Sequence, residues 1–373
     1  MKQEERMEGI TLKDLLSKME PMNATDIHLQ AGCPVAYRIK GEIEKQYDLP
    51  VLNEEQLRNI IFSVLSEKDK KTFEEKGTID TAISFHGIGR FRMSVFLQRS
   101  SIALAARRIS NKIPDFESLH LPEAAKKITD FPNGLVLVTG PTGCGKSSTL
   151  AAIINGINKI RKCHIMCIED PIEYLFKNEL AIINQREIGI DVGSFKEALK
   201  YVVRQDPDVI LVGEIRDRDT VEFALQASET GHLVFGTLHS SNVSQTIGRI
   251  LNFFPHSEHP SIRRALAAHL KAVMSQMLLP SCKEGILLVP AVELMFMNST
   301  IARLIVEEQD SKIVKAIRAG RTEGMQDFEQ SLHYLITEGF ITKEVGLEHA
   351  ENPQSLDMKL RGISLTEEGG IIS

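Results

Sequence analysis

The fold is indicated most directly by one stretch of sequence, Leu135-Val-Leu-Val-Thr139-Gly140-Pro-Thr-Gly-Cys-Gly145-Lys146-Ser147. It contains the complete pattern G-x-x-x-x-G-K-[ST], a glycine-rich loop whose backbone N–H groups cradle phosphates. An apolar run enters this loop, and a helix-compatible segment, residues 147–160, leaves it. Strand, loop and helix in that order are the geometry that phosphate binding requires. The stretch therefore predicts a phosphate-binding loop in an α/β domain.

The residues of this loop have expected roles in binding ATP. The glycines let the backbone curl, Lys146 reaches the β- and γ-phosphates, and the Ser147 hydroxyl binds Mg²⁺. We interpret Cys144 as a tolerated small residue rather than a redox switch, because a position in the loop does not by itself lower the pKa of a thiol. The expected nucleotide-binding residues are Gly140, Pro141, Thr142, Gly143, Cys144, Gly145, Lys146, Ser147 and Ser148.

Apolar strands alternate with helices around the loop, which is typical of a parallel sheet covered on both faces. The clearest predicted strands are residues 135–139, 165–168, 209–212 and 233–238. Acidic residues follow the second and third of them, in Glu169-Asp170-Pro171-Ile172-Glu173 and in Gly213-Glu214. Parallel sheets place their sites at the carboxyl ends of strands, and phosphoryl transfer needs carboxylates for the metal and for orienting water. These clusters are therefore candidates for the catalytic acids.

Two histidines bracket the fourth of these strands. His232 stands at its start and His239 follows its end. A lone histidine usually has a structural role. A strand beside the strand of the loop would bring His239 near the γ-phosphate, so a sensing role is the alternative interpretation.

The chain outside this core predicts further parts. Residues 1–108 are typical of an α+β domain, with helices near 12–19 and 54–65 and a hairpin about Gly41. Its other predicted strands are residues 26–29, 81–85, 89–96 and 102–108. The proline-containing stretch 109–122 is the predicted linker, residues 123–280 the predicted ATPase core, and residues 281–373 a mainly helical region. An apolar stripe from Ile262 to Met277 predicts a helix that stops before Pro280. We expect fraying from about Ser364.

Composition narrows the classes of function. The 373 residues carry a formal net charge of −6, which gives no electrostatic footprint for nucleic acid. No apolar run approaches the roughly 18–20 residues that span a bilayer, and Met1 to Glu8 lacks the apolar core of a signal peptide. We therefore expect a cytoplasmic protein. The five scattered cysteines are expected to be thiols, and the Cys163 and Cys167 pair is not expected to form half of a metal site.

Taken together, the motifs resemble those of the pilus and type II secretion ATPases, and most closely the PilT-like type IV pilus retraction motors. The resemblance covers nearly the whole chain, including the loop and both acidic clusters. The other matching stretches are Asn184-Gln185-Arg186-Glu187, Arg204-Gln205-Asp206-Pro207-Asp208, Gly213-Glu214-Ile215-Arg216-Asp217 and Thr230-Gly231-His232-Leu233-Val234-Phe235-Gly236-Thr237-Leu238-His239.

The resemblance implies a fold and a set of roles. It implies an N-terminal PAS-like α+β domain, a RecA-like P-loop ATPase domain with C-terminal helices, and a homo-hexameric ring. Glu169 is the implied general base, and Glu214 the acid near Mg²⁺. His232 and His239 match the family's histidine box. The family's arginines that close on the phosphates correspond in position to Arg90, Arg92 and Arg107.

The resemblance also implies a machine and its partners. The chain would sit in the cytoplasm, peripheral at the inner-membrane base of the pilus. It would act with an inner-membrane platform protein and return pilin subunits to the membrane. ATP held between two domains joined by a linker would draw them together, and hydrolysis would release them.

Two departures keep alternatives open. The large N-terminal region and four-cysteine zinc insert of the assembly and secretion relatives are missing, which favours retraction. The retraction branch usually shows Ala-Ile-Arg-Asn-Leu-Leu-Ser-Glu-Ser-Leu, whereas this chain has Ser261-Ile-Arg263-Arg-Ala-Leu-Ala-Ala-His-Leu270. An accessory retraction, pilus-assembly or type II secretion ATPase is therefore the main alternative. A nucleotide-gated binding module without hydrolysis and a nucleic-acid translocase are the others. The acidic residues disfavour the module, and the net charge and 6% aromatic content disfavour the translocase.

Overall fold

The structure is a computed structural model that describes residues 10–365 and 371–372. The chain divides into two compact units. The first runs to Lys112 and also includes Glu173–Leu175, and the second contains Ile113–Ile172 and the chain from Phe176 onward. The division after Lys112 falls inside the stretch predicted as a linker. The expectations for Met1 to Glu8, and those for fraying at 366–370 and 373, lie outside the described residues.

The first unit is built on an antiparallel sheet with the strand order β3-β2-β1-β6-β5-β4. Its strands are β1 Ala24–Gln30, β2 Ala36–Ile39, β3 Glu42–Lys45, β4 Thr78–Phe85, β5 Gly89–Gln98 and β6 Ser101–Arg108. Its helices are α1 Leu12–Ser17, α2 Glu54–Phe62 and α3 Glu67–Lys76. Apolar side chains of the helices and sheet form one core, in which Leu15, Tyr37 and Phe91 are fully buried.

Local sequence explains where these elements begin. Thr11 and Asn53 cap α1 and α2 with capping boxes, in which the cap side chain and the third helical residue exchange hydrogen bonds. Helix α3 is capped by Ser66 and ends at Gly77, whose left-handed φ of +70° suits glycine. This helix escaped the sequence prediction because it is strongly charged and buries only Phe73.

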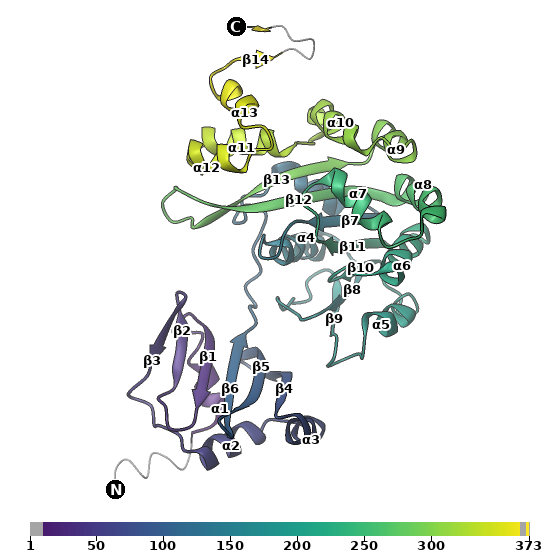
Figure 1. The fold of residues 1–373 in the computed structure, drawn as a ribbon. Coiled ribbons are helices and arrows are strands. Elements are labelled where there is room, and N and C mark those ends of the chain that lie inside the picture. The colour runs from purple at the N-terminus through teal and green to yellow at the C-terminus, as the bar shows by residue number, and fades with distance from the viewer. Residues whose placement is uncertain (1–9, 366–370, 373) are drawn as a thin grey trace. The chain divides into compact units, whose positions relative to one another are not determined.

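The second unit is built on a sheet with the strand order β13-β12-β7-β11-β10-β8-β9 (Figure 1). The strands from β12 to β9 run parallel, and β13 pairs antiparallel with β12. The strands are β7 Gly134–Thr139, β8 His164–Glu169, β9 Ile182–Glu187, β10 Val209–Val212, β11 Leu233–Leu238, β12 Leu270–Pro280 and β13 Leu288–Phe296. Strands β7, β10 and β11 are buried along their whole length, as their apolar sequences predict.

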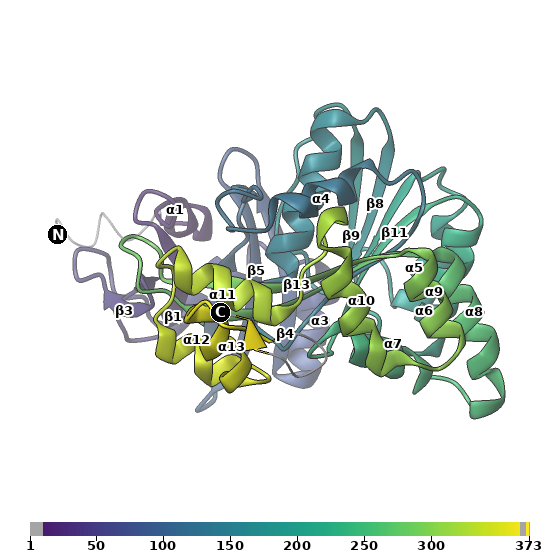
Figure 2. The ribbon, with the colours of Figure 1, turned by 90° about the horizontal axis from the view of Figure 1, so that it is seen from above.

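Helices cover this sheet and extend beyond it. They are α4 Lys146–Ile160, α5 Phe195–Val202, α6 Arg218–Glu229, α7 Val243–Leu251, α8 His259–His269, α9 Ser299–Val306, α10 Ile313–Ala319, α11 Phe328–Thr337, α12 Lys343–His349 and α13 Pro353–Leu360. Helices α11, α12 and α13 lie together over the β12–β13 hairpin, where Phe328 and Leu332 pack against Leu279 and Val289 (Figures 1 and 2). Strands β14 Ser364–Leu365 and β15 Ile371–Ile372 form a short antiparallel pair.

The predicted fold class is confirmed, with an α+β unit before an α/β unit that carries the loop and C-terminal helices. The helix predicted from Ile262 to Met277 is wrong in its second half. Helix α8 ends at His269, and β12 begins at Leu270 and joins the sheet beside β7. In the described part of the chain, no helix is both long enough and apolar enough to cross a bilayer.

Candidate active site

The glycine-rich loop joins the carboxyl end of β7 to the amino end of α4. Gly140, Gly143 and Gly145 have φ values of +145°, +81° and +91°, which side chains rarely tolerate. Gly140 is the most restricted, because a Cβ there would lie 2.3 Å from the carbonyl oxygen of Gln276. The spacing of glycines in the sequence is therefore set by the backbone path of the loop.

Positive charge gathers at the start of α4. The cap residue, Gly145, has no side chain to satisfy the first N–H groups of the helix, which carry the positive end of the helix dipole. The Lys146 ammonium donates to the carbonyl oxygens of Gly140 and Pro141, each at 2.9 Å, and so stays at the loop. Backbone N–H groups and a lysine together make an anion-binding site.

The register of the parallel strands brings both acidic clusters to the edge that carries the loop. Thr139 pairs with Leu238, and Val212 pairs with Gly236 and Ile168, so β7, β11, β10 and β8 end close together at one edge. Gly213 lies against the backbone of Glu169, since a Cβ on Gly213 would be 3.2 Å from the Glu169 Cα. The predicted neighbourhood of loop and carboxylates therefore forms within one sheet edge.

Glu214 and its neighbours form a polar network at this edge. Its Oε1 lies 3.3 Å from His239 Nε2, and its Oε2 lies 2.7 Å from Arg216 Nε. Arg216 also approaches Asp170, with 3.5 Å between its guanidinium and Oδ2. This arginine therefore links the two acidic clusters. Strand β11, which His239 follows, lies beside β7 as the sequence suggested, and the contact of His239 with Glu214 is an addition from the structure.

Glu169 is oriented from the neighbouring strand. Gln185 on β9 donates from Nε2 to Glu169 Oε1 at 3.0 Å, while its own Oε1 accepts from the Phe176 backbone N–H at 3.1 Å. The amide is thus fixed at both ends and holds one carboxylate oxygen. A carboxylate oriented at a strand end has the chemistry of a general base that positions water.

Within the chain, His232 lies away from this edge, although the sequence grouped it with His239 among the candidate catalytic residues. It precedes β11, whereas the loop and His239 follow the carboxyl ends of β7 and β11. Its Nδ1 lies 3.0 Å from the Ala227 carbonyl oxygen and 3.2 Å from Thr230 Oγ1. At about 3.3 Å per residue, the two histidines stand roughly 20 Å apart.

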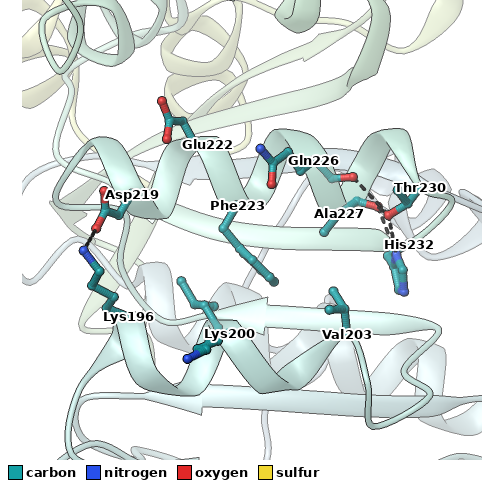
Figure 3. Close-up of a pocket in the computed structure, with 11 residues that line it drawn as sticks. Lys196, Lys200, Val203, Asp219, Glu222, Phe223, Gln226, Ala227, Thr230 and His232 are labelled. Atoms are coloured by element: carbon teal, nitrogen blue, oxygen red, sulfur yellow. Dashed lines mark hydrogen bonds and ion pairs between the residues drawn. The ribbon is translucent and has the colours of Figure 1, made fainter.

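His232 instead lines a pocket of about 710 Å³ between α5 and α6 (Figure 3). Leu199, Val203 and Phe223 provide its apolar surface, and an ion pair of 2.7 Å between Lys196 and Asp219 stands at its rim. The two histidines are separated by strand direction, because β11 starts at the amino edge of the sheet and ends at the carboxyl edge.

The three candidate arginines belong to the first unit. Arg90 and Arg92 lie on β5 and Arg107 on β6, where Arg92 and Arg107 are register partners. Arg107 Nε donates to Asp26 Oδ1 at 2.7 Å, so its side chain is already oriented by an acid. The approach of these arginines to a nucleotide stays a prediction from the family resemblance.

The cysteines are thiols in the described part of the chain. Cys144 is a buried residue of the loop, and a Cβ on Gly140 would lie 2.5 Å from its sulfur. Burial raises the pKa of the Cys144 thiol, despite the nearby Lys146. This supports the interpretation of Cys144 as a small packed residue. Burial also raises the pKa of Cys167, which is enclosed in β8.

Sequence reasoning did not assign roles to Gln185, Arg216 and Gln276. Gln185 and Arg216 stand in stretches that carry the family resemblance, which is the signal that points to them. Gln276 contacts the loop from a strand more than 125 residues later in the chain, and no local pattern marks it.

Comparisons with known proteins agree with this architecture. The family profile of the type II/IV secretion system proteins matches residues 3–346. The type IV pilus retraction ATPase PilT of Pseudomonas aeruginosa is 39% identical over 344 residues, which cover 92% of this chain and 99% of that protein. The chain belongs to the type II/IV secretion system protein family. It is a PilT-like P-loop ATPase.

Two further members of the family are similar over most of their length. The type IV pilus ATPase PilU of Pseudomonas aeruginosa is 38% identical and is matched over 93% of this chain and 90% of its own. A crystal structure of the pilus retraction motor PilT with bound ADP superposes with a TM-score of 0.86 at 42% identity. That match covers 94% of this chain and 99% of the PilT chain.

Proposed function

We propose that this chain is the ATP-hydrolysing motor of type IV pilus retraction. The observation that carries the proposal is the shared sheet edge, where the phosphate-binding loop, Glu169 and Glu214 meet. The near-full-length similarity to a pilus retraction ATPase supports the choice of machine. Pilin disassembly, and with it twitching motility, is then the work that hydrolysis drives.

The residues of the edge have distinct roles in this proposal. The loop N–H groups and Lys146 bind the phosphates of ATP and gain most strength as charge builds on the γ-phosphoryl group. Glu169, held by Gln185, orients the attacking water and accepts its proton. His239 bridges from the strand beside the loop to Glu214, a suitable position for sensing the γ-phosphate.

The residues present fit a magnesium ion. Ser147 and Glu214 offer hydroxyl and carboxylate oxygens, which are the ligands that Mg²⁺ prefers. Both come from segments that follow carboxyl ends of the sheet. When bound, the ion would neutralise phosphate charge.

A homo-hexameric ring that docks on an inner-membrane platform protein, in the cytoplasm, completes the proposal. Both features come from the family resemblance. Light scattering of the purified chain with ADP should then give a mass six times that of one chain. A monomer at all concentrations and with all nucleotides would contradict the ring.

An accessory retraction role is the second candidate function. PilU is nearly as similar to this chain as PilT is. The stretch from Ser261 to Leu270 also departs from the retraction pattern. It forms most of α8, in which Arg263 is bound by Asp310 at 2.7 and 2.8 Å. Pilus assembly and type II secretion are the remaining alternatives within the family.

A deletion strain of the source organism tests these roles together. A primary retraction motor predicts excess surface pili and loss of twitching, restored by the wild-type gene and not by Lys146→Ala. Reduced but persistent twitching would indicate the accessory role. Bald cells would indicate assembly, and normal pili with lost protein secretion would indicate a secretion ATPase. The complementation pair shows that the phenotype depends on the nucleotide site rather than on the presence of the chain.

A further inference from the structure

Strand β12 lies directly against the phosphate-binding loop. It runs parallel to β7, with Ser275 opposite Thr139, so Gln276 reaches the level of Gly140. The hydroxyls of Ser275 and Thr139 are 2.6 Å apart and join the two strands just before the loop begins. Gln276 is only 2% exposed and presses its backbone against Gly140. The side-chain amide of Gln276 therefore faces other protein atoms and not solvent.

Both ends of the Gln276 amide are used at the loop. Its Nε2 donates to the carbonyl oxygen of Cys144 at 2.5 Å, and its Oε1 accepts from Thr149 Oγ1 at 2.9 Å. Thr149, in the first turns of α4, is itself buried. One side chain thus ties the middle of the loop to the helix that follows it, from outside the motif.

This arrangement fixes the direction of a backbone N–H group. The peptide between Cys144 and Gly145 is planar and trans, so its N–H points opposite to its carbonyl oxygen. With the carbonyl held toward β12, the Gly145 N–H points away from β12. Gly145 adopts a φ of +91°, and a Cβ there would lie 3.2 Å from Gln276 Nε2. Glycine is thus required beside the amide.

We propose that Gln276 is a positioning residue for nucleotide binding. It holds the Cys144 carbonyl against β12 and thereby keeps the Gly145 N–H and the start of α4 oriented for phosphate. Without the amide, the peptide is free to rotate, and the loop loses the preorganised set of N–H groups that an anion needs. This proposal rests on the nucleotide site proposed above, but not on pilus retraction.

The test compares ADP affinity in variants of the purified full-length chain. Gln276→Leu removes both hydrogen bonds while keeping an apolar side chain of similar size. We expect its Kd for ADP to rise about tenfold, the equivalent of roughly one buried hydrogen bond. We also expect KM for ATP to rise by a similar factor with kcat nearly unchanged, because the amide does not touch the reacting groups. Thr149→Val removes one of the two bonds and should raise Kd about threefold.

A matched control separates positioning from packing. Ser331 on α11 accepts a buried hydrogen bond of 2.9 Å from the Val292 N–H, and this pair touches no part of the loop. Ser331→Ala should lower the Tm and leave the Kd for ADP unchanged. If Gln276→Leu behaves in the same way, Gln276 only packs and the proposal is overturned.

Further variants keep the test decisive. Gln276→Glu retains the acceptor for Thr149 but loses the donor to Cys144, so its Kd should rise at least as much as that of Thr149→Val. If Gln276→Leu does not fold, unchanged Kd values in Thr149→Val and Gln276→Glu overturn the proposal. Lys146→Ala separates the two levels of inference. Undiminished ADP binding by Lys146→Ala would contradict the proposed nucleotide site itself. Loss of ADP binding in Lys146→Ala, together with unchanged Kd values in the Gln276 variants, would contradict only the positioning role of Gln276.

Discussion

The two ends of strand β11 differ in what they gather, although a histidine stands at each. His239, after the carboxyl end, lies 3.3 Å from Glu214 and beside the phosphate-binding loop. His232, before the amino end, contacts the last turn of α6 and lines the pocket between α5 and α6 (Figure 3). His232 and His239 are close in the sequence but therefore have different surroundings in the structure.

Strand direction is the cause of this difference. In a parallel sheet every strand presents its carboxyl end to the same edge, so residues that follow strands meet there and residues that precede strands do not. The carboxyl edge joins the loop to Glu169, Glu214 and Arg216. The amino edge carries His232, whose partners are the Ala227 carbonyl oxygen and the Thr230 hydroxyl. Distance along the chain is thus a poor guide to membership of the site.

The largest expected effect comes from the lysine of the loop. Lys146→Ala removes the side-chain charge at the carboxyl edge, so we expect loss of ADP binding and of measurable phosphate release. Lys196→Ala, at an exposed lysine that pairs with Asp219 outside the loop, is the matched control and should bind ADP and turn over as the wild type does. Calorimetric titration and phosphate release measure both. Equal effects of the two variants would contradict the role assigned to the loop.

The next effect concerns the general base. Glu169→Gln keeps the shape of the side chain and removes the proton acceptor, so we expect turnover to fall by roughly 10²–10⁴. ADP binding should be retained, because Glu169 is not one of the phosphate ligands of the loop. Glu222→Gln on α6, where the carboxylate pairs with Arg218 outside the loop, is the control with the same change. Wild-type phosphate release from Glu169→Gln would move the base to Glu173 or Glu214.

A smaller effect compares the two histidines directly. His239→Ala should lower kcat about tenfold, because Glu214 loses one polar partner beside the loop. His232→Ala should change kcat by less than about twofold, because its partners lie at the end of α6 and not at the loop. Both are measured as steady-state phosphate release. A larger loss in His232→Ala would show that this histidine acts on a site the single chain does not form.

Much of this edge was predictable from sequence because its signals are local. The loop motif specifies its own strand and helix, and continuous apolar runs identify β7, β10 and β11 as buried strands. The acidic residues follow directly after such runs. Where the chemistry and the secondary structure are encoded within about ten residues, the prediction agreed with the structure.

The failures have physical reasons. Residues 262–277 have helical spacing, but β12 is buried on both faces, so its apolar residues fit a helix pattern and a strand equally well. Strand β9 was missed because it is an edge strand with an exposed Ile182 and polar residues. Gln276 was missed because its partners, Cys144 and Thr149, are long-range contacts. In each case, the structure depends on contacts with other segments of the fold and not on the local sequence pattern.

A buried carboxylate, Glu293, also lies near the carboxyl edge of the sheet. Glu293 on β13 is 2% exposed and accepts the Val243 N–H at 2.6 Å, at the start of the helix that follows His239. Burial raises the pKa of Glu293 to about 7, and the nearby Asp327 and Glu351 add to the effect. The folded chain therefore keeps a proton there, between about pH 4.5 and 7, that the unfolded chain has lost. Stability from this group falls as the pH rises through that window.

Glu293→Gln should remove this pH dependence, because glutamine keeps an acceptor for the Val243 N–H and cannot ionise. We expect the variant to unfold with a free energy higher than that of the wild type by on the order of 1–3 kcal/mol at pH 8, and by much less at pH 5. Urea unfolding followed by circular dichroism suits a chain without tryptophan. Glu284→Gln, an exposed carboxylate in the turn between β12 and β13, should show no such difference. An equal gain in the free energy of unfolding at both pH values would mean that the stabilisation by Glu293→Gln does not come from removal of the buried charge.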